Sequence, residues 1–330
     1  MIQVYTLDGD RLEGAELKPG DKLPPKTLWI DLLNPTADED KAVEQWIGAS
    51  IPTDRDMVEI EESSRFYMEE GVQYFTTPVL HATDSEHRTI APVSFVLANK
   101  RLVTVRYSEP KAFAIFVART TKPGNGLLDH QCTGASVLLG LIDTITDRLA
   151  DILEGATEEI ERASNSILHR HAGERPMSTR EFRRTLTRIG GLGAFLSKVR
   201  ESLSGISRLL AYLRTTLENG QPRKELRGRL DSLERDVRSL ENYLDFLSNK
   251  ITFLLDTIVG LISVEQNAII KIFSIASVGL MPPTLIASIY GMNFHFMPEL
   301  GDPWGYPLAL CAMVLSAILP LYFFWRKGWF

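Results

Sequence analysis

Charged residues are missing from two long runs near the end of this sequence. Residues 272–290 contain no Asp, Glu, Lys or Arg, and neither do residues 306–325. Each run is close to the length, about 20 residues, that an α-helix needs to cross the hydrocarbon core of a membrane. The mean hydropathy of the whole chain is nevertheless near zero, because the remaining residues are strongly charged. The sequence therefore predicts a membrane protein with a large aqueous part.

Cysteine is also scarce, since only Cys132 and Cys311 are present. Two such thiols do not form a disulfide framework, and they fit a reducing cytosol. The start of the sequence lacks the basic segment and apolar run of a cleavable signal, so we expect the amino-terminal part to stay in the cytoplasm. The net charge of −6 argues against nucleic acid as a partner.

Basic residues predict how the spans are oriented. Lys271 precedes the first span, Arg326 and Lys327 follow the second, and the loop over 292–305 has no Lys or Arg. Because Lys and Arg favour the cytoplasmic side of a membrane, we expect both termini to lie in the cytoplasm.

The first part of the chain, residues 1–122, mixes short strands with short helices. Runs of β-branched and aromatic residues bounded by turn residues predict strands at 2–7, 27–32, 72–80, 93–98 and 102–107. Apolar residues at helical spacing predict helices at 37–47 and 54–62. These elements predict an α/β domain of ordinary size.

Long helices are expected over residues 123–271. Apolar spacing predicts one helix over 135–169, and Ser178 with Glu181 forms the capping-box pattern that starts a second. No proline lies between Pro222 and Pro282, so a third helix should continue into the membrane and end at Tyr290, a length of about 100 Å. A helix of that length needs neighbours near the membrane. Copies of the same chain would supply them, so we expect a homo-oligomer.

The turn between the two spans carries a distinctive set of motifs. They are Gly291-Met292-Asn293 at the end of the first span, Met297-Pro298-Glu299-Leu300 after it, Gly305-Tyr306-Pro307 at the start of the second span, and a basic tail. Together they resemble the CorA family of magnesium channels.

The resemblance implies an α/β cytoplasmic domain, long α-helices and a two-helix transmembrane hairpin, assembled as a homopentameric funnel in the bacterial inner membrane. The first span, 272–291, would line the pore, and the loop 292–305 would lie outside the cytoplasm. The second span would cover 306–325, followed by a cytoplasmic tail, 326–330. The resemblance also implies Mg²⁺ as the transported ion, Co²⁺ or Ni²⁺ as secondary ions, and closure when cytoplasmic Mg²⁺ is high.

One face of the first span carries mainly small and polar side chains. At steps of three and four residues it presents Asn267, Ile270, Ser274, Ser277, Met281, Thr284, Ser288 and Gly291, which we call the polar stripe. Such a stripe either lets helices pack closely or lines a water-filled path. The resemblance to the CorA family favours the pore.

The stripe has no carboxylate, which limits the transport mechanism. Mg²⁺ gives up its water reluctantly, so carbonyls, hydroxyls and amides can bind the hydrated ion through its water shell and release it again. We predict a selectivity filter at Gly291, Met292 and Asn293. The predicted polar lining is Asn267, Ser277, Thr284 and Ser288, and the predicted apolar constrictions, which close by dewetting, are Ile270 and Met281. These roles are in part those that the resemblance implies.

Acidic residues outside the span are candidates for further ion contacts. Glu299 in the loop either attracts cations or orders the loop. Asp84, Asp231 and Asp236 are candidates for the regulatory Mg²⁺ site that the resemblance implies, and each of them also fits an ordinary solvated acid.

Signs of an enzyme or of an energy-coupled pump are missing. Residues 190–193, Gly-Gly-Leu-Gly, lack the preceding strand of a phosphate-binding loop and fit close helix contact better. The sequence therefore predicts passive transport and no enzymatic activity. The expected partners are other copies of the chain, membrane lipids and divalent cations.

Two alternatives stay open. A zinc transporter of the same superfamily would share the architecture, and His295 beside the filter supports it, although the stripe has no His or Cys. A membrane-tethered helical scaffold would need only the long helices and the hairpin.

Overall fold

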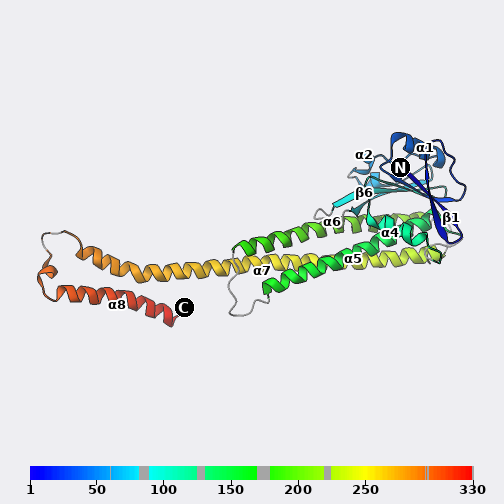
Figure 1. The fold of residues 1–330 in the computed structure, drawn as a ribbon. Helices are drawn as coiled ribbons and strands as arrows, with labels where there is room; N and C mark the ends of the chain where they lie inside the picture. The colour runs from blue at the N-terminus through cyan, green and yellow to red at the C-terminus, as the bar shows by residue number, and fades with distance from the viewer. Residues whose placement is uncertain are drawn as a thin grey trace. The chain divides into compact units, whose positions relative to one another are not determined.

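The computed structural model describes residues 1–59, 61–81, 89–124, 131–168, 179–218, 224–293, 295 and 297–328. The chain forms two compact units, Met1–Leu254 and Leu255–Phe330. The first unit contains a β-sheet and the long helices, and the second contains the end of one long helix and a further apolar helix (Figure 1).

A seven-stranded sheet lies in the first unit. Its strands are β1 (Ile2–Asp8), β2 (Arg11–Leu17), β3 (Thr27–Leu33), β4 (Phe66–Glu69), β5 (Val72–His81), β6 (Thr89–Ala98) and β7 (Arg101–Arg106). They are ordered β2-β1-β3-β7-β6-β5-β4. The central pair β3 and β7 is parallel, and the other neighbouring strands are antiparallel.

All five strands that the sequence predicts are present, whereas its pattern does not indicate β2 and β4. These two are the edge strands of the sheet. Strand β2 has a single buried side chain, that of Leu12, and β4 has none. An edge strand with little buried surface shows no clear alternation of apolar and polar residues, so its sequence carries a weak signal.

Short helices accompany the sheet: α1 (Ala37–Ile47), α2 (Asp54–Met57), α3 (Glu62–Arg65) and α4 (Lys111–Thr120). Helix α1 has the predicted bounds and begins with a capping box between Thr36 and Glu39. The prediction of one helix over 54–62 is wrong, because α2 ends at Met57 and Val58 is exposed. A longer helix there would bury no further apolar side chain at Val58, and packing is what stabilises short helices.

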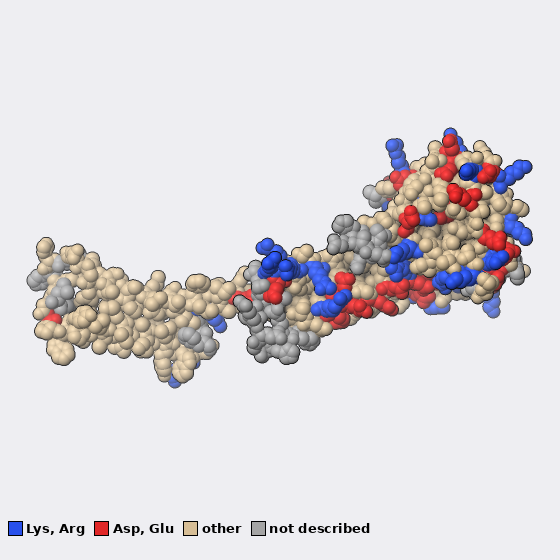
Figure 2. Space-filling model, in the orientation of Figure 1, with Lys and Arg blue, Asp and Glu red and all other residues tan. Residues whose placement is uncertain are grey.

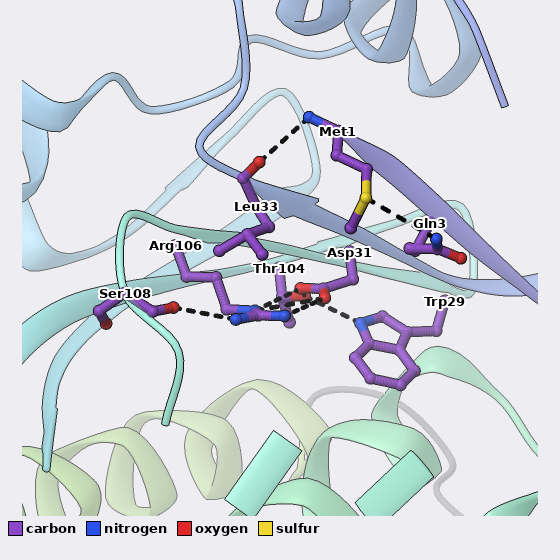
Figure 3. Close-up of polar contacts among 8 residues, drawn as sticks. All are labelled: Met1, Gln3, Trp29, Asp31, Leu33, Thr104, Arg106 and Ser108. Carbon is purple, nitrogen blue, oxygen red and sulfur yellow. Dashed lines mark hydrogen bonds and ion pairs between the residues drawn. The ribbon is translucent and has the colours of Figure 1, made fainter. Parts of the chain in front are cut away.

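A buried ion pair joins the parallel strands β3 and β7 (Figure 3). Arg106 Nη2 lies 2.8 Å from Asp31 Oδ2, and Asp31 is only 2% exposed. The hydroxyl of Thr104 donates to Asp31 over 2.7 Å and accepts from Trp29 Nε1 over 2.9 Å. Arg106 also donates to the carbonyl of Ser108 over 2.9 Å. The two buried charges are thus paired and hydrogen-bonded, as their desolvation requires.

Three long helices follow: α5 (Gly134–Leu168), α6 (Thr179–Glu218) and α7 (Lys224–Tyr290). They agree with the predicted helices, while the predicted cap at Ser178 lies outside the described residues. Helix α6 packs on β5 so closely that a Cβ atom at Gly205 would fall 2.1 Å from Thr77 Oγ1. In Figure 1, α5, α6 and the first part of α7 run side by side within the first unit.

The second unit contains the end of α7, a short 3₁₀ turn at Pro298–Gly301 and helix α8 (Gly305–Arg326). Helices α7 and α8 are the two described helices that are long and apolar enough to cross a membrane. Figure 2 shows this unit mainly in tan, with charged side chains near its ends. The predicted α/β domain, long helices and two-helix hairpin are confirmed. The domain boundaries and the homopentameric funnel stay predictions.

Candidate ion pathway

One face of α7 in the second unit is covered by α8. Ile275 and Gly279 are buried there, and Pro282 and Ile286 are half-buried. A Cβ atom at Gly279 would lie 3.5 Å from Leu321 Cδ2, so the two helices are in contact at this point. Steps of four, three and four residues keep these positions on one side of the helix.

The polar stripe lies on the other side of α7. At about 100° per residue, its positions centre roughly opposite the face that meets α8. Its predicted lining residues are all exposed in the single chain, namely Asn267, Ile270, Ser277, Met281, Thr284 and Ser288. Met281, a predicted constriction, is 69% exposed. Within this unit α8 therefore leaves the stripe open to water or to further copies of the chain.

Thr284 is on this face and directly follows two prolines in the chain. Pro282 and Pro283 have no backbone N–H, so they cannot donate the usual helical hydrogen bonds. The hydroxyl of Thr284 donates to the carbonyls of Leu280, over 2.7 Å, and Met281, over 2.9 Å. A hydroxyl has one hydrogen and two lone pairs, so Thr284 is left as an acceptor on the exposed face. That polarity suits a hydrated cation, because its water shell presents hydrogens outward.

Helix α7 ends in a tight turn at the predicted filter. The amide of Gly291 donates to the carbonyl of Ala287 over 2.9 Å, and the amide of Met292 donates to that of Ile289 over 3.2 Å. A Cβ atom at Gly291 would lie 3.1 Å from the oxygen of Ala287, which is a crowded contact. Gly291, Met292 and Asn293 are all exposed. The turn thus leaves a backbone carbonyl and a carboxamide side chain available at the end of the stripe.

The loop between α7 and α8 contains two acidic residues, Asp302 and Glu299, and the structure describes the side chain of only the first. The carboxylate of Asp302 accepts from the amide of Trp304 over 3.0 Å, so it orders the start of α8. The backbone of Glu299 belongs to the 3₁₀ turn, while its side chain lies outside the described part of the structure. The predicted attraction of cations by Glu299 stays a prediction.

Three acidic residues are the candidates for a regulatory site. Asp84 falls outside the described residues. Asp231 on α7 pairs with Arg214 of α6 over 2.5 Å, and Glu234 pairs with the same guanidinium over 2.6 Å. Hydrogen bonds to Glu234 and Asp231 raise the pKa of Arg214 above its ordinary value. Asp231 therefore already has a cation beside it in the single chain.

Asp236 lies near a second acidic group. Burial raises the pKa of Asp143 on α5, and the charges of Asp147 and Asp236 raise it further. Among the described residues, no three His, Cys, Asp or Glu side chains are grouped so that they could hold a metal ion. A regulatory ion held by these acids would accordingly need ligands from outside the described part of one chain.

Sequence reasoning does not find Arg214 or Glu234, which tie α6 to α7. The signal available in the sequence is weak, because Asp231 and Glu234 are three residues apart on one helix face but Arg214 is far away in the chain. Only the packing of α6 against α7 brings these three side chains together.

The fold and the pathway define a membrane protein with two spans and a large aqueous unit. The chain belongs to the CorA-like Mg²⁺ transporter protein family, whose model matches residues 25–327. The resemblance drawn from the motifs at the turn between the two spans is thereby confirmed. The members of this family are transporters, so the expectation that the chain is not an enzyme is also confirmed.

Curated relatives match along the whole chain. The chain is 34% identical over 329 residues to the magnesium transport protein CorA of Pasteurella multocida, and the match covers 100% of both chains. It is 33% identical over 331 residues to the protein of that name from Salmonella typhimurium, again with 100% coverage. The solved CorA magnesium transporter from Methanocaldococcus jannaschii superposes with a TM-score of 0.78 at 20% identity, covering 100% of this chain and 99% of that one. This structural likeness shows the fold.

Proposed function

We propose that this chain transports Mg²⁺ into the cell as a passive channel for the hydrated ion. Its family and the names of its relatives support Mg²⁺ as the cargo. The channel mechanism rests on one observation: the polar stripe of α7 stays exposed on the side away from α8 and ends at Gly291 and Asn293. Copies of α7 arranged around an axis would turn these stripes toward a shared path.

The filter would consist of the Gly291 carbonyl and the Asn293 side chain, with Met292 between them. Neither group carries a charge, so the filter would hold Mg²⁺ through its water rather than strip it. Along the path, Ser288, Thr284, Ser277 and Asn267 would offer rings of polar acceptors. Met281 and Ile270 would form apolar rings that close the path by dewetting.

The membrane potential would drive the ion. A divalent ion moving inward through 100 mV gains roughly 4.6 kcal/mol, twice the value for a single charge. Transport then needs no second energy source. With both termini in the cytoplasm, Glu299 would lie at the outer mouth, where its charge would concentrate cations.

Closure by cytoplasmic Mg²⁺ would involve acids of the first unit, with Asp231, Asp236 and Asp84 as candidates. Asp231 is paired with Arg214 in the single chain, so Mg²⁺ bound there would compete with a guanidinium. We propose the same assembly and location that the resemblance implies, a homopentamer in the bacterial inner membrane. Co²⁺ and Ni²⁺ are the proposed secondary ions.

Two other functions make different predictions. A zinc transporter would carry Zn²⁺ into vesicles and show no competition by Mg²⁺. A tethered scaffold would carry neither ion and would remain monomeric in detergent.

The test is Mg²⁺ influx into liposomes that contain the purified protein and hold an inside-negative potential. Asn293→Ala should reduce influx by more than about tenfold, since each lost hydrogen bond to a charged partner is worth about 1.5 kcal/mol. Asn242→Ala is the matched control, because Asn242 is exposed on the same helix within the first unit. Full influx through the Asn293 variant would contradict the filter, and entry of Zn²⁺ alone would favour the zinc transporter.

A further inference from the structure

A pocket of about 410 Å³ lies in the first unit, at one end of the sheet. Three connections line it: the turn between β1 and β2, the segment that leads into β3, and the turn between β6 and β7. Its volume falls in the range of small-molecule sites, about 300–1,000 Å³. The transport function proposed above does not use it.

Three cationic residues belong to the lining of the pocket. Lys26, Lys100 and Arg101 all line it, and the described residues of its lining include no Asp or Glu. Arg101 donates from Nε to the carbonyl of Thr27 over 3.2 Å, which holds the guanidinium at the edge of the pocket. Its two terminal nitrogens are separate donors, and a guanidinium fork suits phosphate oxygens.

The amino terminus of a long helix adds to this positive charge. The amide of Gly134, the first residue of α5, donates to the carbonyl of Lys100 over 2.6 Å. A Cβ atom at Gly134 would lie 2.3 Å from the carbonyl carbon of Arg101, so the helix start lies directly against this turn. Because a helix amino terminus carries a partial positive charge, it raises the local potential for anions.

The lining also contains apolar residues. Leu7, Pro25 and Leu28 contribute to the pocket beside the three cations. A bare phosphate ion would leave most of this volume and its apolar side chains unused. A ligand that combines a flat ring with several negative charges would use both the apolar and the cationic side chains.

We propose that this pocket binds a nucleoside polyphosphate, with the phosphates against Lys26, Lys100 and Arg101 and the base against Leu7, Pro25 and Leu28. Such anions are themselves ligands of Mg²⁺, which prefers phosphate oxygens. The site lies entirely within the first unit, so its occupancy is a separate property from ion flux.

The experiment measures equilibrium binding of ATP to the full-length protein in detergent. Isothermal titration calorimetry gives the affinity with and without Mg²⁺. Inorganic triphosphate and adenosine serve as competitors. The test variants are Lys26→Gln and Lys100→Gln, which change two exposed side chains and leave the Arg101 contact with Thr27 in place. Lys41→Gln is the control, because Lys41 is an exposed lysine of α1 outside the lining.

The expected result is saturable binding of ATP that inorganic triphosphate displaces. Each test variant should weaken it about tenfold, and the control variant should not. Absence of saturable binding, equal affinity for adenosine, or unchanged binding in both test variants would overturn the proposal. Binding to vesicles of anionic lipid without binding of free ATP would also overturn it, by assigning the cationic residues to lipid headgroups. None of these readouts depends on Mg²⁺ influx, so this site and the channel can fail independently.

Discussion

The carboxylate of Asp31 is buried between strands β3 and β7, and Arg106 is the cation that neutralises it. We expect Arg106→Met to lower the free energy of unfolding by about 3–5 kcal/mol, because it leaves a buried charge without a partner. Denaturant unfolding followed by circular dichroism measures this change.

Arg11→Met is the matched control for that substitution. Arg11 also pairs with carboxylates, those of Asp8 and Glu13, but all three side chains are largely exposed. Exposed ion pairs contribute little to stability, so the unfolding midpoint should hardly move. Equal effects of the two variants would contradict the role assigned to burial.

Tyr5 makes a prediction about alkaline pH. Burial, with a smaller contribution from the charge of Asp31, raises its pKa to about 12. The folded state therefore keeps the phenol proton at a pH where the unfolded chain has lost it, and stability must fall as pH rises from 10 toward 12. The loss attributable to Tyr5 is roughly 2–3 kcal/mol.

Tyr5→Phe removes this titration. Its unfolding free energy should decline less than that of the unsubstituted protein between pH 10 and pH 11.5, and the tyrosinate absorbance should lose a component that titrates late. Parallel declines in the two proteins would show that Tyr5 does not titrate in this manner.

At the scale of whole elements, the contact between α6 and β5 depends on a missing side chain. Gly205→Ala would place Cβ 2.1 Å from Thr77 Oγ1 and 3.0 Å from Pro78 Cδ. We expect it to destabilise the protein by about 1–3 kcal/mol, because one element must shift to relieve the clash.

Gly190→Ala provides the contrast on the same helix. No atom lies within 4 Å of a Cβ atom built there, so the substitution should stabilise α6 by up to about 1 kcal/mol. Thermal unfolding of the two variants compares them directly. Destabilisation by Gly190→Ala would indicate that this part of α6 contacts another chain.

At the scale of the whole molecule, the proposed channel requires copies of α7 to meet along the stripe. In a background with Cys132→Ser and Cys311→Ser, oxidation of Met281→Cys should give disulfide-linked dimers. Ile272→Cys should give none, because that position is three residues before Ile275 and by helical spacing lies on the side of α7 away from the stripe. A disulfide needs Cα atoms within about 7 Å, so gel electrophoresis after oxidation in the membrane reports which face is shared. Linking at Ile272 alone would overturn the assignment of the stripe.

Much of the architecture follows from local sequence patterns. The bounds of α1 and the continuity of α7 through to Tyr290 could be predicted, because caps, prolines and apolar spacing act within a few residues. The stripe and the Gly291-Met292-Asn293 motif could be recognised in the same manner, and their roles in transport stay predictions. Strands β2 and β4 and helix α4 could not, since edge strands bury little and the aromatic run of α4 suits either a helix or a strand.

The glycines of α6 show the limit of such patterns. The sequence indicates close helix contact at residues 190–193, yet Gly190 and Gly191 have open space beside them and only Gly193 meets Ile251, at 3.7 Å. The glycine that does permit close contact is Gly205. Nothing local distinguishes these positions, because the neighbour of Gly205 is Thr77, far away in the chain.

The sequence by itself determined the two apolar spans, the long helices and the family of this protein, because each depends on residues that are close together along the chain. The tertiary structure decided which face of α7 meets α8. It also decided that Arg106 forms an ion pair with Asp31 and that Arg214 forms one with Asp231. It also brought Lys26 and Arg101 into one pocket and placed the start of α5 against Lys100. These contacts join residues distant in sequence, and their energies depend on burial and distance, which exist only once the chain has folded.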